Sequence, residues 1–110
     1  MKIETKYKFD EFLKNEGNEI IRRKHAIYMI EKINGKIANP HILTTKKNLK
    51  RAVCEDFDFI IEYLIDNGYD IVLAWVKINN EDFMLELQRR KYILLTKTNT
   101  HFLLGRVLRW

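Results

Sequence analysis

The residues of this chain best suited to chemistry are cations, and they are concentrated near the C-terminus. From Arg89 to Trp110 the sequence holds six Lys and Arg residues and no Asp or Glu, with aromatic rings between them. Lys and Arg bind phosphates and exposed rings stack on bases, so this composition favours a nucleic-acid face. The alternative is that the rings lie in the core and the cations protect strand edges. The cations of the predicted face are Arg89, Arg90, Lys91, Lys97, Arg106 and Arg109, and its interaction hot spots are Tyr92, His101 and Trp110.

A second group of cations lies at the start of a predicted helix. Free N–H groups at a helix N-terminus bind anions. Cations at that end oppose the helix dipole at a cost of about 0.3–1 kcal/mol each, which a bound phosphate or carboxylate would offset. The alternative is an ordinary solvated face. The residues of this predicted nucleic-acid or anion site are Thr45, Lys46, Lys47, Lys50 and Arg51.

Catalytic side chains are less prominent in the sequence. There is no serine, Cys54 is the only cysteine, and His25, His41 and His101 are scattered without the spacing of zinc ligands. The sequence therefore predicts no metal site and no cofactor, and it favours a protein without enzymatic activity.

One stretch resembles the Asp…Glu-x-Lys core of the restriction-endonuclease-like fold. It runs from Asn67 to Arg89, with a hydrophobic strand and a turn between the two carboxylates. The resemblance implies that Asp70 and Glu86 hold Mg²⁺ and that Gln88 stands where that family has the lysine that orients the attacking water. The chain lacks that lysine. A small nuclease is therefore the lower-ranked functional alternative.

These side chains must be positioned by a central helix, which the sequence predicts over about residues 45–67. At 100° per residue its apolar residues share one broad face. Thr44 or Thr45 is expected to cap its start, and Asn67-Gly68 to end it in a left-handed conformation. Asp56 falls inside the apolar face. Either Asp56 has a buried partner, for which Arg106 is one candidate, or the helix breaks near residues 54–56.

The segment before this helix has two interpretations. Residues 26–33 and 36–43 form a hairpin around Asn34-Gly35, or residues 19–33 form a helix; the turn sequence favours the hairpin. Pro40 then lies on an edge strand or where pairing ends. A short helix is expected at Phe9–Leu13, preceded by a short strand or a frayed end.

The segment after the central helix is expected to consist of strands. Residues 69–78 contain a continuous apolar run, which indicates a strand covered on both faces. Residues 81–91 are either a helix or a strand, and the strand is favoured because it extends the sheet. Residues 92–98 and 101–110 are expected to form a hairpin.

Length and composition limit the fold class. The 110 residues, with 46% hydrophobic side chains, predict a single α+β domain over residues 1–110, with a mostly antiparallel sheet packed against the central helix. The longest apolar run, Ile71–Val76, is too short to span a membrane. The single cysteine indicates a cytoplasmic protein. The net charge of +5 favours nucleic acid or an acidic protein as partner, and an exposed sheet edge would permit a homodimer.

Together these observations predict a small, basic, intracellular binding module that is not an enzyme. It would contact nucleic-acid phosphates through the C-terminal hairpin and the start of the central helix. The alternative is an interaction factor or inhibitor that docks an acidic protein. Such a size and charge are also typical of accessory proteins of mobile elements.

Overall fold

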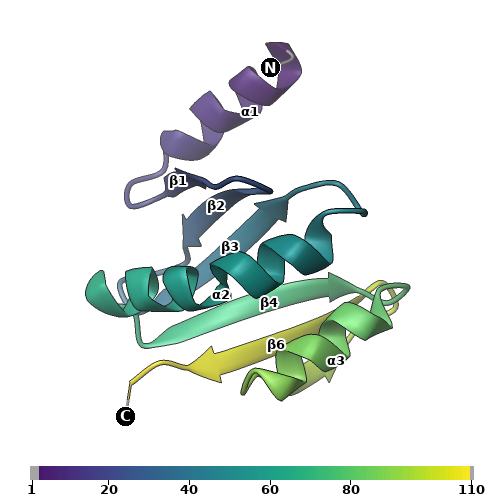
Figure 1. Ribbon diagram of the computed structural model, residues 1–110. Helices are drawn as coiled ribbons and strands as arrows, with labels where there is room; N and C mark the ends of the chain where they lie inside the picture. Colours follow the sequence, from purple (N-terminus) through teal and green to yellow (C-terminus); the bar gives the residue numbers. More distant parts are fainter. Residues whose placement is uncertain (1–2, 110) are drawn as a thin grey trace.

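A six-stranded sheet with two helices over one of its faces and a third helix beside its β1 edge forms the protein (Figure 1). The computed structural model describes residues 3–109. The strand order is β1-β2-β3-β4-β6-β5, and every neighbouring pair is antiparallel except β3 and β4. This confirms the predicted α+β class. The elements are α1 (Ile3–Leu13), β1 (Glu19–Arg22), β2 (Ile27–Lys32), β3 (Ile37–Leu43), α2 (Leu49–Asp66), β4 (Ile71–Lys77), α3 (Glu81–Arg89), β5 (Ile93–Lys97) and β6 (His101–Val107).

The central helix, α2, begins later than its sequence predicted. It starts at Leu49, and neither threonine caps it: the Thr44 hydroxyl donates to the His25 carbonyl at 2.6 Å, and the Thr45 hydroxyl accepts from the Asn48 N–H at 3.2 Å. The predicted threonine cap is therefore wrong. The end of the helix is as predicted, because Gly68 has φ +86° in a left-handed cap.

Asp56 explains why α2 does not break in its middle. Its side chain is only 5% exposed, yet one carboxylate oxygen accepts from Arg23 Nε at 3.0 Å and the other from the Tyr28 hydroxyl at 2.8 Å. Asp56 therefore has a buried partner, as one sequence alternative required, but that partner is not Arg106. The bond to Tyr28 ties α2 to β2, and the bond to Arg23 ties α2 to the loop between β1 and β2.

The hairpin around Asn34-Gly35 is confirmed as β2 and β3. The Asn34 side-chain oxygen accepts from the N–H groups of Lys36 and Ile37, which closes the turn. The sequence did not predict β1, and α1 is longer than the expected helix at Phe9–Leu13. Residues 3–5, for which a short strand or a frayed end was expected, form the first turn of α1.

The prediction of a strand over residues 81–91 is wrong, because Glu81–Arg89 form helix α3. Acidic residues in the first turn and Arg89 in the last turn match the helix dipole. Met84 and Leu87 are both buried against the sheet, whereas Leu85, which would share a strand face with Leu87, is 40% exposed. The hairpin predicted to follow it is confirmed as β5 and β6.

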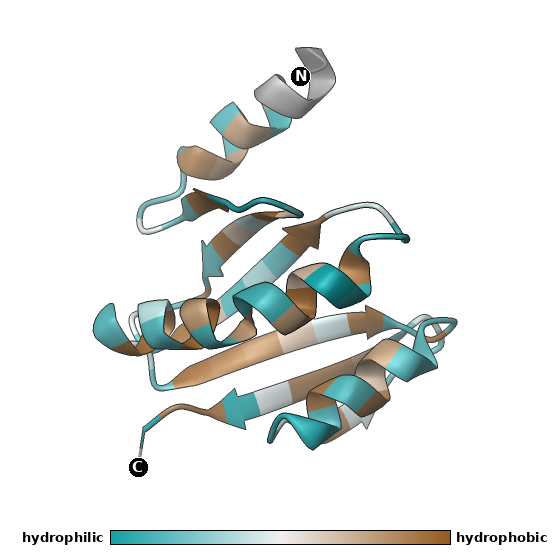
Figure 2. Cartoon of the chain, in the orientation of Figure 1, coloured by the Kyte–Doolittle hydropathy of each residue, from teal (hydrophilic) through white to brown (hydrophobic). Residues whose placement is uncertain are grey.

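Strand β4 is covered on one face only, contrary to the prediction. Val72 and Val76 are buried, while Trp75 is 48% exposed. Figure 1 shows α2 and α3 over one face of the sheet, and Figure 2 shows hydrophobic residues along β4 and β6 beside these helices. Helix α1 contacts the opposite face, because the Phe12 ring meets His41 edge-on, with ring centroids 6.3 Å apart. We call this opposite face, over β2, β3, β4 and β6, the open face, because neither α2 nor α3 covers it.

Strand β5 is the exposed edge of the sheet, and all five of its residues are exposed. The homodimer through such an edge stays a prediction. Among the described residues, no helix is long and apolar enough to cross a membrane.

Candidate functional site

The central strands β3 and β4 pair over only part of their length. Their register joins Ile37 to Ile71 and Ala38 to Val72, and pairing ends there. Beyond that point β3 remains paired with β2 as far as Leu43, and β4 remains paired with β6. The sheet therefore opens between the C-terminal halves of its two central strands.

Pro40 provides a local reason for this opening. The Lys36 carbonyl accepts from the N–H groups of Asp70 and Ile71, so the even-numbered residues of β3 direct their backbone groups toward β4. Pro40 has no N–H to donate in that direction. Its position where pairing ends was one of the two placements that the sequence predicted. The carbonyl of Pro40 and the backbone of Ile42 are left facing the gap.

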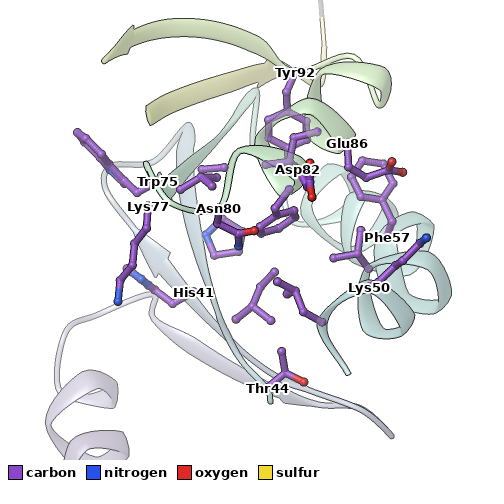
Figure 3. A pocket seen from close by; sticks show the side chains of 18 of the residues that line it. His41, Thr44, Lys50, Phe57, Trp75, Lys77, Asn80, Asp82, Glu86 and Tyr92 are labelled. Atoms are coloured by element: carbon purple, nitrogen blue, oxygen red, sulfur yellow. The ribbon is translucent and has the colours of Figure 1, made fainter. Parts of the chain in front are cut away.

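The gap is the floor of a cleft of about 1130 Å³. Residues from β3, the start of α2, β4 and α3 surround it, and Figure 3 shows their side chains. Both faces of the sheet contribute to its lining. Ala74 and Val76 lie on the helix-covered face, whereas His41 and Trp75 lie on the open face. The cleft therefore connects the two faces of the sheet.

The N-terminus of α2 lies at this cleft. Thr45, Lys46 and Lys50 line it. Asn48 makes no side-chain cap, and the first turn holds no acidic residue, so the N–H groups at this helix end are not capped by a side chain. Lys46 and Lys50 are exposed, and neither forms an ion pair with any residue in the described part of the chain. Helix dipole and lysines together make this end of the cleft suited to an anion.

The other members of the predicted helix-start site lie outside the cleft. Lys47 and Arg51 are exposed on the surface of α2 and do not line it. The structure thus divides the five predicted anion-site residues into three that face the cleft and two that do not.

Two of the C-terminal cations, Arg89 and Arg90, are paired with Glu86. Their guanidinium groups lie 3.2 and 3.0 Å from its carboxylate. Hydrogen bonds from Arg90, which has the larger effect, and from Arg89 lower the pKa of Glu86. Arg106 donates to the Arg90 carbonyl at 3.2 Å, and its guanidinium lies 5.5 Å from the centre of the Phe57 ring. These cations are engaged within the protein.

The remaining C-terminal residues are spread over separate places. Arg109 lies 3.7 Å from Asp70, Lys97 lies over the Phe102 ring, and Lys91 follows α3 with φ 73°. His101 lies edge-on to the Trp75 ring, with ring centroids 6.2 Å apart. The predicted hot spot Trp110 lies outside the described residues.

Tyr92 is a predicted hot spot that is buried, at 8% exposure, as the core alternative expected. It lines the cleft beside Phe57. Burial raises the pKa of the Tyr92 hydroxyl to about 12, partly opposed by the Arg106 charge. The phenol therefore stays neutral at physiological pH.

The raised pKa of Tyr92 predicts a loss of stability at alkaline pH. In the unfolded chain a tyrosine loses its proton near pH 10, so the stabilising contribution is complete below pH 10 and is lost as pH rises toward 12. At pH 11.5 we expect the wild type to have lost about 2 kcal/mol of its free energy of unfolding through Tyr92, and we expect Tyr92→Phe to be spared this loss. Urea unfolding at pH 9 and pH 11.5 measures this difference. An equal alkaline loss in both proteins would contradict it.

The two carboxylates of the nuclease resemblance are occupied by cations of the chain. Asp70 lies near Arg109 and 4.0 Å from Lys36, and Glu86 holds its two arginines. Within the described residues, no group of His, Cys, Asp and Glu side chains is arranged to hold a metal ion.

Sequence reasoning missed a polar cluster on the open face. The Glu31 carboxylate lies 3.0 Å from His41 Nε2 and 3.2 Å from Asn39 Nδ2. His41 and Asn39 both line the cleft. In the sequence, His41 is one of three scattered histidines without a recognisable partner. The hairpin register around Asn34-Gly35, which pairs Glu31 with Asn39, is the signal from which this cluster was predictable.

Comparison with known proteins identifies the fold. No family model and no curated protein matches the sequence. The N-acetyltransferase PseH of Campylobacter jejuni matches with a TM-score of 0.77 and 14% identity, over 94% of this chain and 78% of that one. A GNAT family acetyltransferase from Elizabethkingia anophelis, solved with acetyl-CoA bound, has a TM-score of 0.71 and 10% identity, over 96% of this chain and 84% of that one.

The structure named Ard1 from Thermoplasma volcanium is also similar. It has a TM-score of 0.63 and 9% identity, and the match covers 76% of this chain. The matched part corresponds to 62% of the length of that protein. At these identities the likeness establishes the fold alone.

This likeness corrects the functional prediction from sequence. A non-catalytic nucleic-acid-binding module, an inhibitor and a mobile-element accessory factor all conflict with a fold shared with acetyltransferases. The same fold replaces the restriction-endonuclease-like fold that the resemblance at Asp70 and Glu86 implied. The physical reason is that cations near one another in sequence are distributed over different carboxylates, carbonyls and rings by the fold.

Proposed function

We propose that the protein binds acetyl-CoA in the cleft between β3 and β4 and transfers the acetyl group to an amine. The observation that carries this proposal is the interrupted pairing of the two central strands, with the uncapped N-terminus of α2 at the resulting cleft. Such a gap provides an elongated site with an anion-binding end, which suits a ligand that has a diphosphate at one end and a thioester at the other.

The diphosphate is assigned to the start of α2. Lys46 and Lys50 line the cleft there, and the first N–H groups of the helix have no acceptor within the helix itself. Hydrogen bonds to charged phosphate oxygens are about twice as strong as neutral ones. The anion site predicted from the sequence is thereby retained, with acetyl-CoA as its proposed ligand.

The pantetheine arm is assigned to the unpaired edge of β3. The arm has two amide groups, which can hydrogen-bond to the backbone groups of Pro40 and Ile42. These backbone groups face the gap because β4 does not pair with this part of β3. An extended ligand that adds to an open strand edge in this way gains main-chain hydrogen bonds. Apolar walls from Phe57 and Ala74 line the same cleft and suit the methylene groups of the arm.

The comparisons support the ligand. Structures of the same fold contain acetyl-CoA, both in the Elizabethkingia anophelis protein and in PseH. A cytoplasmic location, inferred from the single Cys54, is part of the proposal, since acetyl-CoA is a cytoplasmic metabolite.

Calorimetric titration with acetyl-CoA at about 50 mM salt tests the proposal, because low salt leaves charge interactions weakly screened. We expect saturable binding that ADP displaces and adenosine does not, because only ADP carries the diphosphate. Absence of acetyl-CoA binding at millimolar concentration would overturn the proposed function. Mass spectrometry of reactions that contain amines then measures transfer, and it avoids thiol reagents that would label the exposed Cys54.

A further inference from the structure

The cluster of Glu31, Asn39 and His41 lies on the open face, across the gap from the helices. Direct strand partners share a face, and the register places Glu31 opposite Asn39. His41 follows two residues later on the same face. The face on the other side is covered by α2 and α3, as Figure 1 shows. A second substrate therefore reaches the gap most directly from the open face.

Glu31 fixes the orientation and the tautomer of His41. Its carboxylate oxygen lies 3.0 Å from Nε2, so this nitrogen carries the proton that the carboxylate accepts. Asn39 donates to the same oxygen at 3.2 Å and holds the carboxylate in place. The edge of Phe12 lies against the imidazole ring. In the neutral ring with the proton on Nε2, the lone pair lies on Nδ1, and no described residue donates a hydrogen bond to it.

We propose that the open face is the acceptor site of the reaction and that His41 Nδ1 accepts the proton of the incoming amine. This proposal rests on the function proposed above. His41 is the catalytic residue, and Glu31 is a positioning residue that acts through it. His41, Asn39 and Trp75 line the cleft from this face, so an amine beside them lies in the same cleft as the acetyl-CoA proposed above.

The step balances without any further reactant. The acceptor ammonium first loses one proton to solvent. The lone pair of the neutral amine then attacks the thioester carbonyl carbon, the N–C bond forms and the C–S bond breaks. One proton of the amine passes to His41 Nδ1, and the sulfur leaves as a thiolate. The imidazolium then returns that proton through solvent to the thiolate. The products are the acetylated amine and CoA.

The open face also specifies the class of acceptor. Leu43 and Trp75, which line the cleft from this face, are 41% and 48% exposed. Glu31 is the only carboxylate in the described strands β2, β3 and β4, and its oxygen is already bonded to His41 and Asn39. A polycation finds no further carboxylate on these strands. The acceptor is therefore an amine with a single charge and an apolar body.

Transfer assays with acetyl-CoA and hexylamine or phenethylamine, compared with spermidine, test this inference. We expect the apolar amines to be acetylated faster. We expect His41→Gln to lower kcat about 100-fold, as loss of a general base does, with acetyl-CoA affinity within about twofold of wild type. Added imidazole should restore part of the rate. His25→Gln is the matched control, because His25 also pairs with a glutamate, Glu55, at 3.5 Å, but lies outside the cleft.

The positioning role of Glu31 is tested by a double-mutant cycle. Glu31→Gln alone should lower kcat about tenfold with little change in the KM for amine, and it should have no further effect in the His41→Gln background. Additive losses would overturn the positioning role.

The outcomes separate the two proposals. If wild type does not bind acetyl-CoA, the proposed function fails. If wild type binds acetyl-CoA and acetylates amines but His41→Gln keeps its rate within threefold, or spermidine is preferred, only the present inference fails. Binding without transfer to any of these amines would also overturn the acceptor site.

Discussion

Reversing the two lysines that face the cleft, Lys46→Glu with Lys50→Glu, is expected to weaken acetyl-CoA binding about 100-fold. The variant removes two charged partners of the diphosphate and adds two repulsive charges to the end of the cleft. Loss of a hydrogen bond to a charged group costs about 1.5–3 kcal/mol, so about 3 kcal/mol in total is a conservative expectation. Calorimetric titration at about 50 and 200 mM salt measures the change, and the difference between the proteins should shrink at higher salt.

The neighbouring pair of cations is the matched control for this variant. Lys47→Glu with Arg51→Glu makes the same change in net charge at the same helix end, but these residues do not line the cleft. We expect a loss of no more than about fivefold from the altered field alone. Equal losses of acetyl-CoA affinity in the two variants would show that only the overall electrostatic field at this helix end matters. That result would contradict direct contact between the two lysines and the diphosphate.

Asp56→Ala is expected to destabilise the protein by about 3 kcal/mol, the low end of the cost of breaking a buried ion pair. The substitution leaves Arg23 without its carboxylate and removes the acceptor 2.8 Å from the Tyr28 hydroxyl. Because Asp56 joins α2 to β2, the same substitution loosens the wall of the cleft. Urea unfolding followed by circular dichroism measures the free energy of unfolding.

Asp58→Ala is the control for this second prediction. Asp58 lies in the same helix but is exposed, and surface substitutions of this kind change stability by no more than about 0.5 kcal/mol. Asp56→Asn, which keeps an acceptor oxygen at the same position, should lie between the two. A loss of less than 1 kcal/mol in Asp56→Ala would refute the structural role assigned to this carboxylate.

Local features of the fold were predictable because they depend on a few adjacent residues. The Asn34-Gly35 turn formed as predicted, since the Asn34 side chain closes it within three residues. The left-handed end of α2 at Gly68 and the single buried arc of α2 also follow from short-range sequence. The helix-or-strand ambiguity at residues 81–91 was resolved wrongly. Packing of Met84 and Leu87 on the sheet decided it, and neither contact is visible in a local pattern.

The candidate site was predictable only in part. Cations at the start of α2 were found from sequence because they lie just before the helix or in its first turn. Their division into Lys46 and Lys50 inside the cleft and Lys47 and Arg51 outside it required the position of β3. The same holds for Asp56, whose partner is Arg23 and not Arg106, because the choice depends on which part of the chain lies beside this turn of the helix.

The sequence by itself determined the class of the fold, the central helix and its cationic start, because hydrophobic periodicity, turn residues and charge are properties of neighbouring positions. Tertiary structure alone decided the parallel pairing of β3 with β4 and the placement of His41 and Trp75 on either side of the gap, whereas Pro40 gave a local signal for the end of pairing. Strands that pair in parallel are joined by a long crossover, here through α2, so nothing local fixes their register. The cleft on which the proposed function depends lies between those two strands.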